Sequence, residues 1–152
     1  MGRVPAVVGS PAVTAPQADV GTEYVVDAHG CDAAALRDRA LLDELFRDVV
    51  DALGLLPAAD TLWKIFPSPG GITGLLLLEE SHLTVHTFPE HRTAAFNLYC
   101  CRPRSTWPWH DELSARLGAS RVTVRAIERV GGAERPERNS GDTRHGPRRP
   151  AA

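Results

Sequence analysis

Residues 70–101, GGITGLLLLEESHLTVHTFPEHRTAAFNLYCC, decide the fold of this chain. The apolar run at 72–78 follows two glycines and is short enough to be a buried β-strand. Residues 82–88 then alternate in polarity, and residues 93–101 carry a second strand-like pattern. The turn at 89–92, which contains a proline, therefore joins two strands in a predicted antiparallel hairpin.

The hairpin brings a serine and two thiols together. If Phe88 pairs with Thr93 across the turn, Ser81 faces Cys100. A register one residue longer places Ser81 opposite Cys101 instead. In either register, residues that are far apart in the sequence become neighbours, and we take Ser81 as the candidate reactive centre.

Helices and further strands are predicted on both sides of the hairpin. The helix at 33–53 follows from an apolar stripe at helical spacing, with Asp32 as its expected N-cap and Gly54 as its end. In chain order, the elements are a strand at 24–26, a helix at 33–53, a strand at 61–66, the hairpin strands, a helix at 107–117 and a strand at 121–127. This order predicts an α+β two-layer sandwich, a mainly antiparallel sheet with two helices on one face. The other face must be polar or covered by another subunit.

Length and composition limit the class of protein. The chain has 152 residues, 43% of them hydrophobic, and a net charge of -2, as expected for one globular domain. That charge gives no general attraction to nucleic acid, and no apolar run is long enough to span a membrane. Three cysteines cannot all pair, so we expect free thiols and a cytoplasmic protein. We expect a domain at 22–130, with a disordered extension at 1–21 and a disordered tail at 131–152.

The residues alone leave several interpretations of the hairpin open. It can be a structural hairpin with a surface serine and scattered histidines. A metal site built from His82, His86 and His91 is disfavoured, because strand positions four apart lie about 13 Å apart. Nucleophile chemistry remains, with either Ser81 or Cys101 paired with His86. No G-x-S-x-G motif surrounds the serine, which argues against a hydrolase of that type.

One long segment carries a resemblance to a known family. The sequence ESHLTVHTFPE at 80–90 closely resembles the processing-site motif of the prokaryotic S-adenosylmethionine decarboxylase proenzymes. The GITG sequence at 71–74, the GCD sequence at 30–32 and Cys101 stand at the spacings of that family. The similarity covers about residues 22–128.

The resemblance implies a chain that cleaves itself between Glu80 and Ser81. The Ser81 hydroxyl would convert the amide into an ester, and His86 would remove the α-proton that releases residues 1–80. Thr73, where the family often has serine, would support the acyl shift with its hydroxyl. A pyruvoyl group generated from Ser81 would then be the cofactor, with no metal and no pyridoxal phosphate. Its ketone would form a Schiff base with the substrate amine and accept electrons as CO₂ departs.

Further roles follow from the same resemblance. Cys101 matches the proton donor of decarboxylation, which favours the longer hairpin register. Cys100 is then a packing residue, and Cys31 a structural thiol. Glu90 matches the carboxylate that binds the ribose hydroxyls of the substrate; without the resemblance, it reads as a surface charge in a turn.

Three positions depart from the family pattern. Pro67 stands where the family commonly has an aromatic residue that stacks on adenine, and Phe66 precedes it as a candidate substitute. Asn97 and Tyr99 replace a usual Asp and Phe. The expected activity is decarboxylation of S-adenosylmethionine for spermidine and polyamine biosynthesis, by a homodimer of processed chains. The alternatives are an L-ornithine or L-arginine decarboxylase of the same family and an unprocessed, non-catalytic regulatory paralogue.

Overall fold

The structure, a computed structural model, describes residues 19–131 of the chain. The disordered segments predicted at 1–21 and 131–152 therefore lie almost entirely outside the described residues. The first strand already begins at Asp19, before the expected domain boundary at residue 22.

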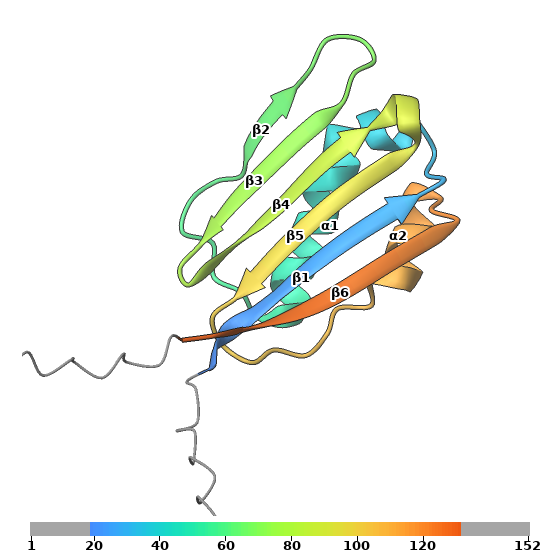
Figure 1. Ribbon diagram of the computed structural model, residues 1–152. Coiled ribbons are helices and arrows are strands. Elements are labelled where there is room, and N and C mark those ends of the chain that lie inside the picture. Colours follow the sequence, from blue (N-terminus) through green and yellow to red (C-terminus); the bar gives the residue numbers. More distant parts are fainter. Residues whose placement is uncertain (1–18, 132–152) are drawn as a thin grey trace, which may run out of the picture.

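Six strands form one sheet in the order β2-β3-β4-β5-β1-β6, and every neighbouring pair is antiparallel (Figure 1). The strands are β1 (Asp19–His29), β2 (Leu62–Ile65), β3 (Ile72–Leu78), β4 (Ser81–Phe88), β5 (Thr93–Cys100) and β6 (Arg121–Val130). The predicted hairpin of β4 and β5 is confirmed, and β3 extends it as a third consecutive strand.

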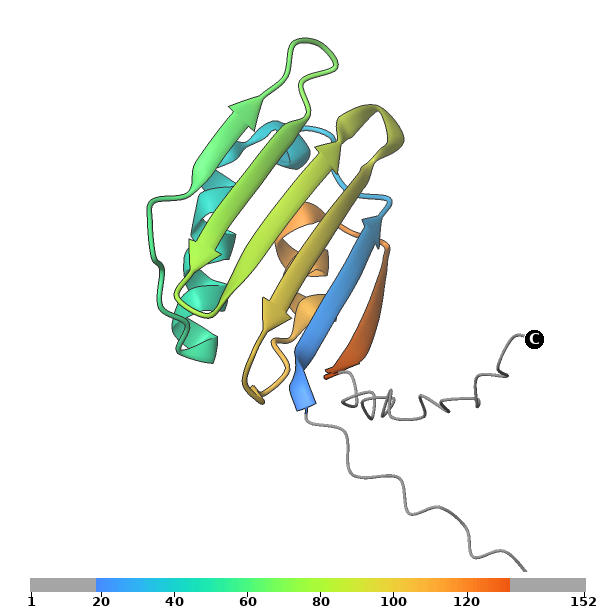
Figure 2. The same cartoon turned by 60° about the vertical axis from the view of Figure 1, so that its left-hand side comes forward.

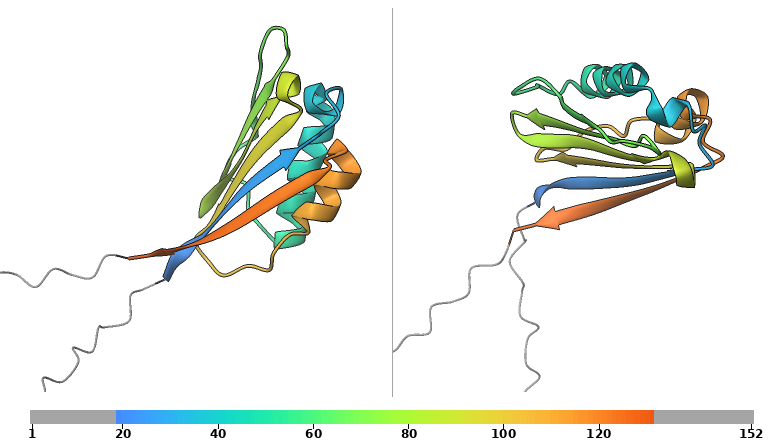
Figure 3. Two further views of the ribbon diagram at one scale, coloured as in Figure 1. Left: turned by 45° about the vertical axis from the view of Figure 1, so that its right-hand side comes forward. Right: turned by 90° about the horizontal axis from the view of Figure 1, so that it is seen from above.

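Both helices, α1 (Arg39–Leu53) and α2 (Trp109–Leu117), cover the same face of the sheet (Figure 3). The core lies between the two layers, where Phe46 of α1, Phe96 of β5 and Trp109 of α2 are almost completely buried. Burying an apolar side chain of this size contributes roughly 1.5–3 kcal/mol. The predicted α+β two-layer sandwich is confirmed.

The first helix starts later than predicted. A short 3-10 helix, η1 (Ala35–Arg37), comes first, and Asp38 is the N-cap of α1. The Asp38 carboxylate accepts hydrogen bonds of 2.9 and 3.1 Å from two N–H groups of the first helical turn. Asp32, the predicted cap, accepts a bond from the Ala34 N–H at 2.9 Å instead. Both aspartates are good N-caps, and the bend between them separates η1 from α1.

The hairpin adopts the shorter of its two possible registers. Phe88 pairs with Thr93, so the longer register favoured by the resemblance is wrong. The turn is a 3-10 helix, η2 (Pro89–His91), closed by Arg92 in the left-handed conformation with φ of 51°. This compact turn fixes the pairing, and Cys101 stands just beyond the end of β5.

The sheet face opposite the helices is mixed in character. Ion pairs of 2.5 Å join Arg125 to Asp27 and Arg129 to Glu23 across β6 and β1. Exposed apolar side chains gather at the other edge of this face, on β2 and β3: Leu62, Leu75 and Leu77. The described residues thus leave a sheet face with both charged and apolar parts uncovered.

Candidate active site

Ser81 is the first residue of β4 and follows the two-residue turn Glu79-Glu80. It pairs with Leu78 of β3 but is not yet paired with β5, because that pairing starts at His82. The Ser81 side chain is half-buried and lines a small pocket of about 70 Å³ at this end of the sheet. The remaining lining residues come from three segments: Leu55, Leu56, Leu78, Glu79, Glu80, Cys100, Cys101, Arg102 and Arg104.

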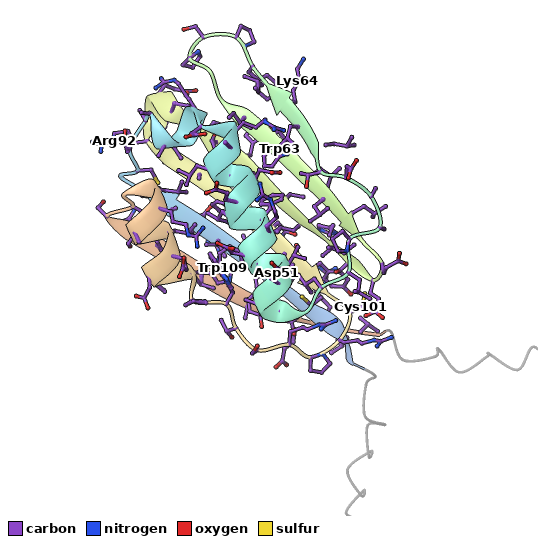
Figure 4. The ribbon with its side chains drawn as sticks, turned by 180° about the vertical axis from the view of Figure 1, so that it is seen from behind. Asp51, Trp63, Lys64, Arg92, Cys101 and Trp109 are labelled. Carbon is purple, nitrogen blue, oxygen red and sulfur yellow. The ribbon has the colours of Figure 1, made fainter. Side chains whose placement is uncertain are left out.

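Glu80, the residue before the serine, is held by two consecutive side chains. The Cys101 thiol donates a hydrogen bond to the Glu80 carbonyl oxygen. The Arg102 guanidinium forms a 2.5 Å ion pair with the Glu80 carboxylate. Arg104 fastens the same segment to the end of α1, donating bonds of 3.0 and 3.1 Å to two carbonyl oxygens there. In Figure 4, Cys101 accordingly lies beside the C-terminal end of α1.

A second group of predicted site residues surrounds His86. Thr73 of β3 pairs directly with His86 of β4, and the Thr73 hydroxyl is hydrogen-bonded to His86 Nδ1. Two aromatic rings flank the imidazole, with ring centroids 5.9 Å away for Phe66 and 4.7 Å away for Phe88. The structure therefore brings together the Thr73, His86 and Phe66 that the sequence nominated.

Glu90 is exposed in the η2 turn at the far end of β4. Arg92 supports this turn by donating hydrogen bonds of 2.8 Å to the Cys31 carbonyl and 3.2 Å to the Gly30 carbonyl. Gly30 has φ of 70° and approaches Ser120 so closely that a Cβ atom would lie 2.1 Å from its Oγ. The GCD sequence thus forms a compact bend that anchors the turn carrying Glu90.

The predicted site residues lie in two places within one chain. The β3–β4 turn and the β4–β5 turn lie at opposite ends of the sheet (Figure 2). Ser81 and Cys101 lie at the first of these ends, whereas Glu90 lies at the second. His86 stands five positions along β4 from Ser81, about 16 Å at the usual rise of a strand. Strand alternation also directs the two side chains to opposite faces. His86 therefore does not reach Ser81 of the same chain.

A polar network that the sequence did not indicate starts at the residue after Ser81. His82 Nε2 lies 3.0 Å from Asn97 Oδ1, and Asn97 Nδ2 donates to a Glu23 carboxylate oxygen at 2.8 Å. Because Asn97 presents its oxygen, His82 is assigned as the donor through Nε2. The hydrogen bond from Asn97, followed by the bond and charge of Arg129, holds the pKa of Glu23 below its ordinary value. The strand pairing explains the network: His82 of β4 and Glu23 of β1 both pair with Tyr99 of β5, and Asn97 lies two positions away on the same face of β5.

The His82, His86 and His91 metal site is not assembled: among residues 19–131, no three His, Cys, Asp or Glu side chains are grouped as metal ligands. Within the same range, no helix is long and apolar enough to cross a membrane.

The three cysteines are expected to differ strongly in reactivity. All are free; Cys31 and Cys100 are buried, whereas Cys101 is exposed. Burial also raises the pKa of the Cys31 and Cys100 thiols. Since alkylation needs an accessible thiolate, iodoacetamide should modify Cys101 first under native conditions. Peptide mapping by mass spectrometry measures this, with Cys101→Ser as the control, and equally fast labelling of Cys100 would contradict the structure.

Comparisons with known proteins agree on one family. A family model described as S-adenosylmethionine decarboxylase matches residues 22–130. The S-adenosylmethionine decarboxylase proenzyme of Methanococcus maripaludis strain C5 is 32% identical over 114 residues, covering 72% of this chain and 89% of that protein. The proenzyme of Clostridium tetani is 29% identical over 112 residues, covering 73% and 87%. The crystal structure of the adenosylmethionine decarboxylase from Aquifex aeolicus VF5 matches with a TM-score of 0.61 and 28% identity, covering 77% of this chain and 96% of that one.

Fold and sequence thus define a decarboxylase of the carboxy-lyase class. The chain belongs to the S-adenosylmethionine decarboxylase family. That family is, in general, pyruvoyl-dependent.

Proposed function

We propose that this chain is a self-processing, pyruvoyl-dependent decarboxylase of S-adenosylmethionine. The observation that carries the proposal is the hydrogen bond from the Cys101 thiol to the Glu80 carbonyl oxygen. This carbonyl is the one that Ser81 must attack to cleave the chain. A donor placed there stabilises the negative charge that develops on the oxygen during attack.

The surroundings of Ser81 suit its conversion to a pyruvoyl group. The residue lies directly after a tight turn, and it is paired with β3 but not with β5, so its peptide can move more freely than one in mid-strand. The pocket beside it is lined by the Cys101 thiol and by the guanidinium groups of Arg102 and Arg104. The thiol offers a proton donor for the substrate, and the two guanidinium groups give this pocket positive charge.

Self-cleavage would proceed in two stages. The Ser81 oxygen bonds to the Glu80 carbonyl carbon, the Glu80–Ser81 C–N bond breaks, and the hydroxyl proton passes to the released nitrogen. A base then removes the α-proton of residue 81, and the bond between its Cβ and the ester oxygen breaks. The Glu80 carboxylate leaves with the upstream chain. Dehydroalanine remains at position 81, and hydrolysis releases ammonia and leaves the ketone.

We assign Thr73 and His86 to the proton transfers of this process. The Thr73 hydroxyl and His86 Nδ1 are hydrogen-bonded to each other, so one proton can be shared between them. In decarboxylation, the pyruvoyl group supplies an electron sink for the electrons left by CO₂. Cys101 would return a proton to the substrate carbon, and Phe66 and Glu90 would bind the adenine and the ribose hydroxyls.

The separation of these residues supports a homodimer whose two sites each use both chains. Ser81 and Cys101 lie at one end of β4, and Glu90 lies at the other. If two copies pack their uncovered sheet faces together about a two-fold axis, the Ser81 end of one sheet can meet the Glu90 end of the other. The exposed leucines of β2 and β3 would be buried in such a contact. Because Ser81 stands at the end of β4 that is not paired with β5, a bend there would turn it toward His86 of the partner.

The position of Phe66 favours S-adenosylmethionine over ornithine or arginine. Pro67 occupies the position where the family commonly has an aromatic ring, but the Phe66 ring lies next to His86, with centroids 5.9 Å apart. It is 41% exposed, so one part of its surface is available for stacking. We also propose that the protein is cytoplasmic, because all three of its cysteine thiols are free.

Denaturing mass spectrometry of the purified protein tests the proposal. Two fragments separated between Glu80 and Ser81 are expected, and Ser81→Ala should remain a single chain of 16.4 kDa. Release of CO₂ from S-adenosylmethionine, ornithine and arginine should then be measured in parallel. Activity on either amino acid alone would shift the assignment to that substrate. An intact wild-type chain without activity would instead support the unprocessed paralogue.

A further inference from the structure

We propose that Arg102 is a positioning residue for self-cleavage, acting through the side chain of Glu80. This inference rests on the proposed function and extends it to a residue outside the ESHLTVHTFPE motif. It concerns the rate at which the precursor cleaves itself, not the chemistry of decarboxylation.

The first argument is the geometry of the segment that follows β5. Cys101 binds the carbonyl of Glu80, and Arg102 binds its carboxylate at 2.5 Å. One residue is thus held at both of its oxygen-bearing groups by two adjacent side chains. Arg104 connects this segment to α1 through two carbonyl oxygens, 3.0 and 3.1 Å away. The position of Glu80 is therefore fixed relative to α1, although the residue lies in a two-residue turn.

The second argument is electrostatic. Attack by Ser81 creates a negative charge on the Glu80 carbonyl oxygen. The carboxylate of the same residue is only a few bonds away and, if unpaired, would repel that charge. The Arg102 guanidinium pairs with the carboxylate and so offsets this repulsion. Arg102 therefore favours the transition state of the acyl shift more than the ground state.

The third argument concerns the product. Cleavage leaves Glu80 as a chain terminus with a second, newly formed carboxylate. Arg102 and Arg104 both line the pocket at that terminus. Their positive charges stabilise this carboxylate as the bond between it and Cβ of residue 81 breaks. The arginines thus act on both sides of the cleavage step.

Exposure of the ion pair predicts an effect on rate and not on folding. The Arg102 and Glu80 side chains are 70% and 36% exposed, and ion pairs this accessible contribute little to stability. A variant at Arg102 should therefore fold normally, with an unchanged melting temperature, and still cleave slowly. A purely structural role for the residue would show the opposite combination.

The test follows cleavage of newly synthesised precursor over time by denaturing electrophoresis and mass spectrometry. Arg102→Gln is expected to cleave about tenfold more slowly than wild type, a smaller loss than the roughly 10²–10³-fold effect of removing a direct oxyanion donor, because Arg102 acts through the Glu80 side chain. Arg102→Lys keeps the charge and should recover most of the rate. The effect of Arg102→Gln should disappear in a Glu80→Gln background, since the double-mutant cycle isolates their interaction. Arg47→Gln, which breaks a comparably exposed 2.7 Å pair with Asp43, is the matched control and should cleave normally.

Hydroxylamine identifies the step that Arg102 affects. It cleaves esters faster than amides, so it should release fragments from His86→Ala, in which the ester accumulates. It should not accelerate Arg102→Gln, in which the ester forms slowly. Wild-type rates for Arg102→Gln, or an unchanged defect in the Glu80→Gln background, would overturn this inference while the proposed function stands. A wild-type precursor that never cleaves would overturn the proposed function itself.

Discussion

Co-expression of Ser81→Ala chains with His86→Ala chains is expected to restore the self-cleavage that neither variant shows alone. In the proposed homodimer, a mixed pair would bring the intact Ser81 of one chain to the intact His86 of the other. The reason is structural: the two residues lie about 16 Å apart along β4 and on opposite faces of the sheet within one chain. When equal amounts of the two variants assemble at random, about half of the His86→Ala chains are in mixed dimers. Each of these chains has its Ser81 beside an intact His86, so about half of the His86→Ala chains should be cleaved.

Tags of different mass on the two variants make the result unambiguous. Only the His86→Ala chain should yield fragments, because the other lacks the serine. Mixing the purified variants after folding, without subunit exchange, is the control and should give no cleavage. Intact chains in every mixture would show that both residues must act within one chain, contrary to the separation described here.

Replacing Thr87 by valine is expected to lower the free energy of unfolding by about 2–4 kcal/mol. Thr87 is only 2% exposed, and its hydroxyl joins three parts of the fold. It donates to the Leu36 carbonyl of η1 at 2.8 Å and accepts from the Ile72 N–H of β3 at 2.8 Å. Valine keeps the volume but leaves both buried backbone groups without these partners.

Urea unfolding measures this change, and it should be done with Ser81→Ala in the background so that one intact chain is compared. Thr87→Ser retains the hydroxyl and loses a methyl group, so it should cost only about 1 kcal/mol. Equal losses for valine and serine would show that packing, and not hydrogen bonding, makes this residue important. Because Thr87 follows His86 on β4, a loosened Thr87 should also slow cleavage.

The fold was largely predictable because its signals are local. Alternating polarity along β4 and β5 indicated strands, and the apolar stripe of α1 indicated a helix that packs against a sheet. The start of α1 was predicted wrongly because Asp32 and Asp38 are both competent caps, and only the η1 bend selects between them. The register was predicted wrongly because it followed from the assigned role of Cys101 and not from the turn.

The motif nominated the candidate site residues, but it could not predict that they lie at two places in one chain. A motif such as ESHLTVHTFPE nominates residues without stating whether one chain or two supply a given site. Strand alternation places Ser81 and His86 on opposite faces of β4, and it does not identify the chain that supplies the missing partner. Arg102 was missed because its contact is long-range and its side chain is flexible. The observed register brings Glu80 close to Cys101. Arg102, which follows Cys101 and has the opposite charge to Glu80, is then a natural partner for the Glu80 carboxylate.

The position of β1 in the sheet has a consequence for the proposed self-cleavage. A cut after Glu80 assigns β1, β2 and β3 to one chain and β4, β5 and β6 to the other. Yet β1 lies between β5 and β6, and β3 lies against β4. The two products are therefore interleaved, and neither can leave without dismantling the sheet. Their arrangement would be set while the precursor folds as one molecule, so the two fragments of a processed protein would not be expected to refold together after unfolding.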